Sequence, residues 1–401
     1  MMLYASGCHQ IGGTDDNDAA AEGYELLVDE IGDEEAEAIL RNAVYHFLLS
    51  QFQCGLFDNP YITEENAINT VWNNQTDAEA KIDQQKIIIM LKNDGVIAQN
   101  DGVKKTVYIP MTFTAATEAG SSAEASPAKW EAAMDINTVS KYFNVVTDTV
   151  GEPSGPDGTY TENDVIRASA DDLAACDLIL ISMDAPSQDS TQDADGNWLP
   201  ANLQYGEYTA VNARRESIAA DTQVNTINDG YYGTKTETVK LNRSYAANTT
   251  GKSSKYSQLE LLQYVNTVKG DAKVVVLMSK ASGPSVMIFS EVEPLADAIL
   301  FYYGGSWVFT DVLMEAVNGD FEPTALLPFQ MPASMDAVEG TAQKEDVPRD
   351  VECYVDTAGN AYDFAFGLNW SGVINDERVA TYKVDPLENV QNIRFHYADE
   401  D

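Results

Sequence analysis

The chain has 401 residues, of which 44% are apolar and 22% are charged, a composition typical of a globular protein. It carries 64 acidic and 24 basic residues, a formal net charge of −40. A surface this acidic repels nucleic acids and anionic membranes, so the composition excludes both as partners. Two interpretations of the charge remain: a solvated acidic coat of the kind that salt-adapted proteins carry, or a surface that binds cations or a basic partner.

The N-terminus shows no export signal. No apolar run approaches the roughly 18 consecutive residues that a membrane-spanning helix needs. Residues 1–8 also lack the basic flank and the long apolar core of a signal peptide. The sequence therefore favours a cytoplasmic protein, with a missing start of the gene as the alternative.

The cysteines and histidines are too scattered to predict a metal site. Cys8, Cys54, Cys176 and Cys353 lie far apart, and no Cys-x-x-Cys pair occurs. Cys54 and Cys176 stand in apolar runs, which predicts small core residues. A dinucleotide loop is also absent, because Gly12-Gly13 lacks the spacing and the preceding strand. We expect no metal and no cofactor.

The first 91 residues predict two helices. Residues 1–32 are acidic and are expected to be irregular. From Asp33 to Gly55 apolar residues recur every three or four positions, which predicts a helix with one apolar stripe and acidic residues in its first turn. A polar loop then runs to about residue 76. Residues 77–91 predict a second helix whose last turn, residues 87–91, is deeply buried.

Further along, short apolar runs predict the strands of a sheet. They lie at residues 106–110, 143–146, 178–181, 274–278, 298–303 and around 326. Helical patterns separate them at 163–175, 258–268 and 308–318, the last stopped by Asn318-Gly319. This alternation predicts an α/β fold, a three-layer sandwich whose sheet of about six strands is mostly parallel.

Residues 184–255 interrupt the alternation. They are rich in polar residues and glycine, with one helical fragment at 208–219. So long a segment in a compact domain is usually functional or disordered. Here it leaves the carboxyl end of a parallel strand, where open α/β sheets bind ligands, so we favour function. Asp193–Asn197 is similar to a calcium loop, but its glycine is misplaced, which favours a plain turn.

The last part of the chain, residues 333–401, predicts a long wrap around the sheet. Aromatic residues alternate in the stretch from Tyr362 to Trp370. This alternation indicates a β-ribbon or an edge segment packed on the domain.

Three stretches, in this order, resemble glycoside hydrolase family 3, the bacterial β-glucosidase and β-xylosidase family. The first runs from Arg41 to the Gly55-Leu56-Phe57 exit of a last barrel helix. The second, residues 88–95, is similar to the family's Leu-Lys-Asn step into its second domain. The third combines Gly319–Pro328 with Phe364–Leu368, similar to the family's Gly-x-x-x-Pro-x-x-x-Leu-Pro and Phe-Gly-x-Gly-Leu signatures.

The resemblance implies a domain organisation. Residues 1–62 are expected to be the C-terminal remnant of a (β/α)8 barrel, 63–84 a linker and entry helix, and 85–401 the α/β sandwich domain with its wrap. In the family the barrel carries a nucleophilic aspartate and the sandwich supplies a general acid/base glutamate, as retaining hydrolysis requires. The implied substrate is a β-linked glucoside or xyloside.

The chain also departs from the family. A (β/α)8 barrel needs roughly 250 residues, whereas the Gly-Leu-Phe exit is already reached at Gly55. No Ser-Asp step precedes the region that Ala5–His9 resembles, and His9 stands where relatives have an aspartate. The nucleophile is therefore absent. We expect a truncated gene product or one half of a split enzyme, inactive without a barrel-domain partner.

Candidate site residues follow from the resemblance. The family's acid/base lies ahead of an Asp-Arg pair, whose nearest equivalent here is Asn242-Arg243. Glu237 is the closest preceding glutamate and the first candidate, with Glu207 and Glu216 as alternatives. An exposed loop residue is the competing interpretation of Glu237, and a surface ion pair with Arg214 or Arg215 that of Glu216. Asn242 and Arg243 are candidates for substrate binding, and Asp184, Asp189 and Asp193 are reserve carboxylates.

Three functional interpretations remain open. The leading one is the incomplete family 3 β-glycosidase. The second is a carbohydrate-binding or regulatory module without chemistry of its own. The third, an enzyme of the doubly wound class with another substrate, is disfavoured because neither a phosphate loop nor a nucleophile elbow occurs.

Overall fold

The computed structural model describes residues 7–10, 17–71, 73–117, 124–186, 202–209, 223–229, 233–239, 249–250, 252–280, 286–304, 309–342 and 351–382. The chain divides into two compact units. The first comprises Met1–Ala78 and Glu216–Arg243, and the second Glu79–Arg215 and Ser244–Asp401. Among the described helices, none is long and apolar enough to cross a membrane.

The helices and strands follow one another along the chain in a fixed order. They are α2 (Asn17–Ile31), α3 (Asp33–Gln53), α4 (Glu64–Val71), α5 (Asn74–Gln85), β1 (Ile89–Asn93), β2 (Thr106–Ile109), β3 (Met111–Thr114), β4 (Lys129–Ala132), α6 (Ile136–Tyr142), β5 (Asn144–Thr147), β6 (Thr149–Val150), β7 (Val165–Ile166), α7 (Ala170–Ala174), β8 (Leu178–Asp184), β9 (Tyr208–Thr209), β10 (Gln223–Asp229), β11 (Gly233–Val239), β12 (Thr249–Thr250), α8 (Tyr256–Val268), β13 (Lys273–Lys280), β14 (Ala298–Tyr303), α9 (Thr310–Asn318), α10 (Met335–Ala342), β15 (Leu368–Asn369), β16 (Gly372–Val373) and α11 (Glu377–Tyr382).

The first unit is built on the predicted helix α3. Asp33, Glu34 and Glu35 occupy its first turn, where the helix dipole favours negative charge. The helix packs against α2, and the small residues Ala36 and Ala43 are buried. The strands β10 and β11 form a separate antiparallel hairpin.

Three expectations for the first unit are wrong. Residues 17–31, expected to be irregular, form helix α2. The expected polar loop up to residue 76 contains helix α4, none of whose side chains is buried. Cys54, expected in the core, is exposed, whereas Cys176 in the second unit is buried as predicted. Apolar neighbours in sequence do not bury Cys54, because it caps the C-terminal end of α3 and its neighbours Phe52 and Leu56 are themselves exposed.

The second unit is an α/β sandwich around an eight-stranded sheet, with strand order β16-β15-β1-β14-β13-β8-β2-β5. The five strands from β14 to β5 run parallel to their neighbours, which confirms the predicted mostly parallel sheet. Strands β1, β15 and β16 extend it in antiparallel fashion at one edge. In chain order the parallel strands are arranged 2-1-3-4-5, the flavodoxin type of doubly wound sheet.

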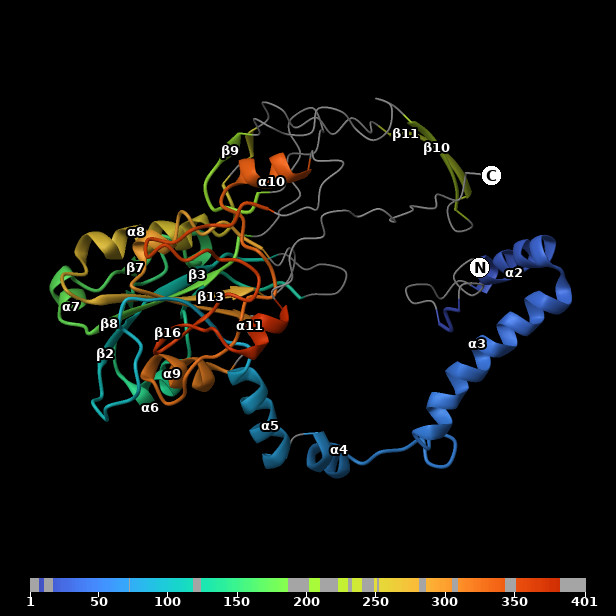
Figure 1. Ribbon diagram of the computed structural model, residues 1–401, viewed down its shortest axis with the longest axis horizontal. Helices are drawn as coiled ribbons and strands as arrows, with labels where there is room; N and C mark the ends of the chain where they lie inside the picture. The colour runs from blue at the N-terminus through green and yellow to red at the C-terminus, as the bar shows by residue number, and fades with distance from the viewer. Residues whose placement is uncertain are drawn as a thin grey trace. The chain divides into compact units, whose positions relative to one another are not determined.

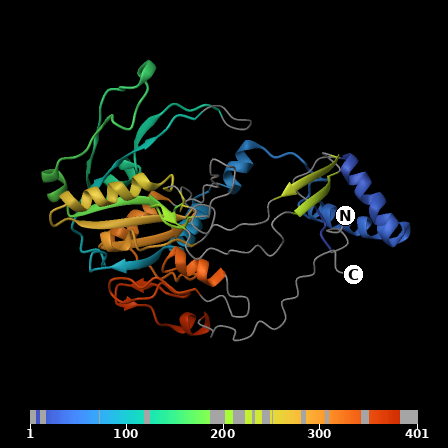
Figure 2. The ribbon, with the colours of Figure 1, turned by 90° about the horizontal axis from the view of Figure 1, so that it is seen from above.

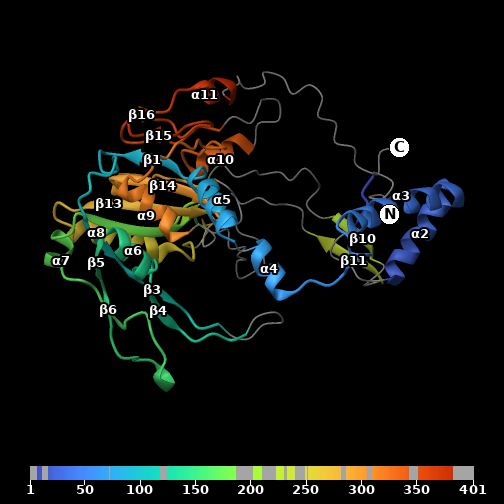
Figure 3. The same cartoon turned by 90° about the horizontal axis from the view of Figure 1, so that it is seen from below.

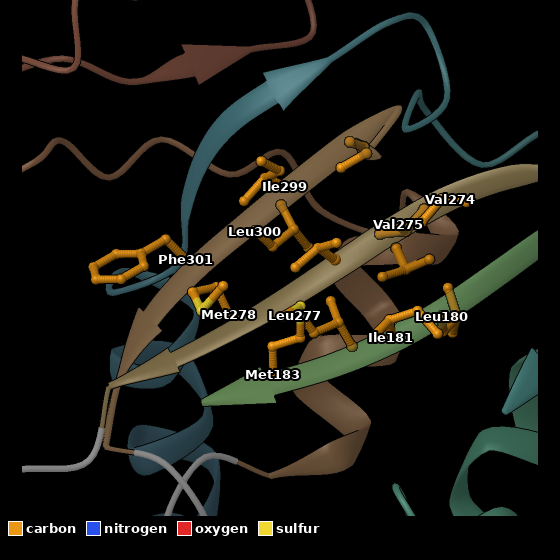
Figure 4. Packing of buried hydrophobic residues seen from close by; sticks show 14 of the residues in the cluster. Leu180, Ile181, Met183, Val274, Val275, Leu277, Met278, Ile299, Leu300 and Phe301 are labelled. Atoms are coloured by element: carbon orange, nitrogen blue, oxygen red, sulfur yellow. The ribbon is translucent and has the colours of Figure 1, made fainter. Parts of the chain in front are cut away.

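The core lies along the central strands. Val275 pairs with Leu180 on one side and with Ala298 on the other. All three are buried, as are the apolar residues around them in the same strands. Figure 4 shows these side chains interleaved across β8, β13 and β14. Continuous apolar runs rich in β-branched residues form these strands because both faces of the sheet are covered.

Helices cover both faces of the sheet, as predicted. Helices α7 and α8 lie on one face, and α6 and α9 lie on the other (Figure 1). Helix α9 ends where the sequence predicts, because Gly319 adopts the left-handed conformation with φ of 80°.

One apolar run is a strand and not the end of a helix. Residues 87–91 were expected to close the helix that begins at Asp77, but α5 ends at Gln85 and β1 begins at Ile89. The predicted burial is correct, since Met90 and Leu91 are fully buried. The strand forms because β14 offers an open edge with which β1 pairs in antiparallel register.

Other expected elements also differ. Residues around 326 form no strand, although the Leu327 N–H donates to the Phe366 carbonyl at 2.7 Å. The helix expected at 163–175 is the short strand β7 followed by α7, which begins at a capping box between Ser169 and Asp172. Of the helical fragment expected at 208–219, residues 208–209 form strand β9 and the rest lies outside the described residues.

The C-terminal wrap supplies the sheet edge, as its aromatic alternation predicted. Strands β15 and β16 lie beside β1, with α11 next to them (Figure 3). Two hairpins, β3–β4 and the one closed by β6 and β7, extend away from the sheet (Figure 2).

Candidate functional site

The carboxyl ends of the parallel strands are where a doubly wound sheet binds ligands. Strand β8 ends at Asp184, β13 at Lys280 and β14 at Tyr303. All three of these adjacent strands therefore end in a polar residue. The chain reverses its direction of winding between β2 and β8, so this edge also contains the switch point of the sheet.

Three polar residues lie in register across these strand ends: Asp184, Ser279 and Tyr302, here called the strand-end row. Ser279 is the register partner of both Asp184 and Tyr302. Its hydroxyl donates to Oδ1 of Asp184 at 3.0 Å. Burial raises the pKa of Tyr302 to about 12, and the charge of Asp184 acts in the same direction. Tyr302 is therefore a neutral hydrogen-bonding group at physiological pH.

Helix α8 completes the surroundings of Asp184. Gln258 receives the Asp184 N–H on Oε1 at 2.8 Å and donates from Nε2 to Oδ2 at 3.3 Å. Lys255 Nζ lies 3.3 Å from the same oxygen. The Asp184 carboxylate still has 46% of its side-chain surface exposed. It is thus held by three partners while keeping access to solvent.

Lys280 is the unusual cation of this edge. Its residue surface is only 6% exposed, yet within the described part of the chain its ammonium group makes no hydrogen bond or ion pair. Burial lowers the pKa of Lys280, and the charge of Asp184 opposes that effect. A buried ammonium without a partner is costly, so it marks a position that can receive an acceptor atom.

Hydrogen bonds hold the segment 202–209 next to the carboxyl end of β8. Tyr205 is fully buried and donates from its hydroxyl to the Asp184 carbonyl at 2.7 Å. The backbone N–H groups of Tyr205 and Gly206 donate to the two carboxylate oxygens of Glu291, at 2.6 and 3.0 Å. A Cβ on Gly206 would lie 2.7 Å from Oε1 of Glu291, so a larger residue here would require the Glu291 side chain to shift.

Together these groups can bind hydroxyl-bearing ligands. They offer one accessible carboxylate, an amide and two ammonium groups. No group of three or more His, Cys, Asp or Glu side chains in the described residues could hold a metal ion. The strand-end row, together with Gln258, Lys255 and Lys280, therefore provides binding groups around one solvent-accessible carboxylate.

The sequence-predicted site residues fall in different places. Glu207 lies in the second unit and is exposed, and its carbonyl accepts from Gln204 Nε2 at 3.1 Å. Glu237 lies in the first unit, on strand β11 opposite Asn225. Glu216, Asn242, Arg243, Asp189 and Asp193 lie outside the described residues. Their roles stay predictions.

Ser279, Lys280 and Gln258 were missed at the sequence level, and Asp184 was only a reserve carboxylate. The sequence does contain a signal for Ser279 and Lys280, because they directly follow the apolar run 274–278. Two polar residues at the carboxyl end of a buried parallel strand are candidates for ligand contact. The distant partners Asp184 and Gln258 become visible only through the register of the sheet.

No protein-family model and no curated protein sequence matches the chain. Several solved structures match the chain. A β-glucosidase from Erythrobacter marinus is 17% identical with a TM-score of 0.42, and 86% of this chain covers 42% of it. A β-glucosidase from Listeria innocua in complex with isofagomine is 12% identical with a TM-score of 0.42, and 86% of this chain covers 40% of it.

A β-glucosidase involved in saponin metabolism from intestinal bacteria is 15% identical with a TM-score of 0.40, over 86% of this chain and 44% of the other. The chain thus spans about two fifths of the length of these enzymes. All three of these structures are of β-glucosidases. At this level of similarity we assign no activity from the comparison.

Proposed function

We propose that the 401 residues of the chain form the α/β sandwich domain of a retaining β-glycosidase of glycoside hydrolase family 3, together with the end of its barrel domain. The activity would be hydrolysis of terminal O-glycosidic bonds in β-glucosides or β-xylosides during carbohydrate breakdown. The expected boundaries are 1–62 for the barrel remnant, 63–84 for the linker and entry helix, and 85–401 for the sandwich.

The packing at two motif glycines carries this proposal. A Cβ on Gly319 would overlap the Ala98 carbonyl oxygen, and a Cβ on Gly367 would overlap that of Ala325. The glycines of the two signature-like segments are therefore required by close backbone contacts. The two signature segments also meet, since the Ala365 N–H donates to the Leu327 carbonyl at 2.8 Å.

A buried ion pair in the second motif supports the same proposal. Lys92 follows Leu91 in the Leu-Lys-Asn step, and its Nζ lies 2.6 Å from Oε1 of the fully buried Glu293. The motif lysine thus has a specific internal partner. A lysine at this position fastens the start of the domain to the turn before β14.

In the proposed mechanism a glutamate of the segment after β8 is the acid/base. Glu237 is the first candidate, with Glu207 and Glu216 as alternatives, and Asn242 and Arg243 would contact the sugar. Retaining hydrolysis needs a second carboxylate about 5–5.5 Å away as nucleophile. The barrel domain would supply it. One carboxylate attacks the anomeric carbon, while the other protonates the leaving oxygen and then activates water.

The test is hydrolysis with and without a barrel domain. A polypeptide of these 401 residues alone should not measurably hydrolyse aryl β-glucosides or β-xylosides, because loss of a nucleophile removes several orders of magnitude in rate. Adding a family 3 barrel domain should restore turnover. Robust hydrolysis by the polypeptide alone would contradict the proposal and direct attention to Asp184, Asp189 and Asp193.

The acid/base is then identified in the active complex. Glu237→Gln should slow substrates with poor leaving groups more than activated aryl glycosides, because only poor leaving groups need protonation. Glu207→Gln and Glu216→Gln are the matched variants, and whichever of the three shows this leaving-group dependence is the acid. Sugar binding without turnover in every combination would support a non-catalytic carbohydrate-binding module in place of the enzyme.

A further inference from the structure

A hollow lies away from the strand-end row, at the antiparallel edge of the sheet. It has a volume of about 540 Å³, within the range of small-molecule pockets. The loop of residues 360–366 forms one side, and residues 373–379, which run from the end of β16 into α11, form the other. Every residue that lines it belongs to the second unit.

The polar groups of this hollow present acceptor oxygens. Asp363 uses Oδ1 to accept from the Phe364 N–H at 2.7 Å and from Gln330 Nε2 at 3.0 Å, and among the described residues its Oδ2 accepts nothing. The Nδ2 of Asn360 donates to Oδ2 of Asp356 at 3.0 Å, which leaves the Oδ1 of Asn360 available to a ligand. The Asn375 side chain, exposed at the rim, makes no hydrogen bond within the described chain.

The remaining wall is apolar and rigid. Phe366 is 8% exposed and stacks on Tyr362, with ring centroids 5.3 Å apart. Ile374 is held in place by its N–H, which donates to the Gly367 carbonyl at 2.9 Å. Val379 of α11 completes this side. The hollow therefore combines a fixed apolar surface with acceptor groups around it.

Backbone strain brings these groups together. Ala365 has a φ of 64°, a left-handed conformation that costs a residue with a side chain roughly 1–2 kcal/mol. Its N–H donates to the Leu327 carbonyl at 2.8 Å, and the Phe366 N–H turns back to the Asp363 carbonyl at 3.0 Å. This tight turn places Asp363 and Phe366 on the same hollow. Strain of this kind is concentrated at binding sites.

We infer that this hollow binds a neutral polyhydroxylated ring, a saccharide unit, at a site separate from the strand-end row. Hydroxyl groups donate to Asp363 Oδ2 and Asn360 Oδ1, the Asn375 amide both donates and accepts, and the apolar wall receives the C–H face of the ring. Among the described residues that line the hollow there is no lysine or arginine, which disfavours an anionic ligand. The inference does not depend on the proposed catalytic activity.

Binding of cellobiose to the full chain, measured by calorimetry or by ligand-observed NMR, tests the inference. Asn375→Ala should weaken binding up to about tenfold, the loss of one or two hydrogen bonds. Val373→Trp should abolish it, because Val373 is 55% exposed at the hollow and tolerates a large side chain that fills the space. Asn163→Ala, at an exposed asparagine outside the hollow, is the control and should leave the affinity unchanged.

A second comparison separates a saccharide from an amine. Asp363→Asn keeps an acceptor oxygen for its two internal donors but removes the charge. The amide nitrogen that replaces Oδ2 can donate to a ligand hydroxyl, which accepts as well as donates, so cellobiose binding should fall by no more than about tenfold. Binding of an alkylammonium probe such as choline would instead be lost. Absence of cellobiose binding at tens of millimolar, binding insensitive to Val373→Trp, or a charge-dependent preference for choline would each overturn the inference. Unfolding curves for every variant confirm that the fold is intact.

Discussion

Lys92 and Glu293 form an ion pair in the interior of the sandwich, with Nζ and Oε1 2.6 Å apart and side-chain exposures of 7% and 0%. Tyr354 donates its hydroxyl to the other oxygen of Glu293 at 2.8 Å, and Thr357 donates to Oε1 at 2.7 Å. The pair thus connects β1, the turn before β14 and the C-terminal wrap. Its satisfied hydrogen bonds make the burial of two charges tolerable.

Removing one member of this pair should strongly destabilise the protein. Lys92→Met leaves Glu293 buried without its cation, and we expect a loss of about 3–5 kcal/mol in the free energy of unfolding. The double variant Lys92→Met/Glu293→Leu should recover part of that loss, because no charge then remains buried. Urea unfolding of the three proteins measures both effects, and a single variant as stable as the parent would contradict this account.

The same pair predicts a pH dependence. Burial alone would raise the pKa of Glu293, but the hydrogen bonds from Lys92, Thr357 and Tyr354 outweigh it and lower the pKa below its ordinary value. The stabilisation is therefore fully present above the ordinary pKa of glutamate and is lost as the pH falls through the lower pKa of the folded state. The difference in unfolding free energy between the parent and the Lys92→Met/Glu293→Leu variant should shrink on acidification. A constant difference would exclude this linkage.

Substitutions at two glycines distinguish the cost of steric overlap from the cost of backbone strain. Gly319 and Gly359 both have positive φ, 80° and 87°, but a Cβ meets the Ala98 carbonyl only at Gly319. Gly359→Ala should cost roughly 1–2 kcal/mol, the strain of the left-handed conformation alone. Gly319→Ala should cost clearly more, because the Ala98 backbone must also move. Equal losses of stability, measured by thermal or urea unfolding, would show that the overlap is relieved at no cost.

Lys280 should limit stability. Lys280→Met removes a buried ammonium that lacks a partner in the described chain, so we expect an increase of about 1 kcal/mol or more in the free energy of unfolding. Lys273→Met, at a lysine that is 54% exposed, is the control and should change stability by less than about 0.5 kcal/mol. A destabilised Lys280→Met variant would indicate that the ammonium makes a favourable contact.

The effect at Lys280 should depend on pH. Burial lowers the pKa of Lys280 against the opposing charge of Asp184, so the unfolded chain binds the extra proton in the interval below the ordinary lysine pKa of 10.5. The parent protein therefore gains stability as the pH rises from neutral through the lowered pKa. The advantage of Lys280→Met should accordingly shrink toward alkaline pH. If the extra stability of Lys280→Met grew with pH, the pKa of Lys280 would be raised by folding and not lowered.

The net charge of −40 predicts stabilisation by salt. Repulsion between acidic residues favours unfolding, and ions screen it over a Debye length of about 10 Å at 0.1 M and about 3 Å at 1 M. The melting temperature should therefore rise between low salt and roughly molar sodium chloride. A flat or falling curve would count against the solvated acidic coat.

The sequence predicted much of the sandwich. Five of the six expected strands form where the apolar runs near residues 107, 144, 179, 275 and 300 place them. They are recognisable because a strand covered on both faces needs an unbroken apolar run. The stop of α9 at Gly319 was equally visible, since a left-handed residue at a helix end is most often glycine.

Tertiary structure decided what local pattern leaves open. Residues 87–91 carry an apolar run that fits a buried helix end as well as a strand, and only the free edge of β14 makes them strand β1. The apolar run near residue 326 forms only isolated backbone hydrogen bonds to the C-terminal wrap, and so it does not become a strand of the sheet. The strand-end row joins Asp184 to Ser279, 95 positions apart along the chain, through the register of β8 and β13. Sequence determines which residues must be buried, but pairing depends on neighbours that are remote in the chain, so the partners of each strand and of each polar group are settled only when the sheet assembles.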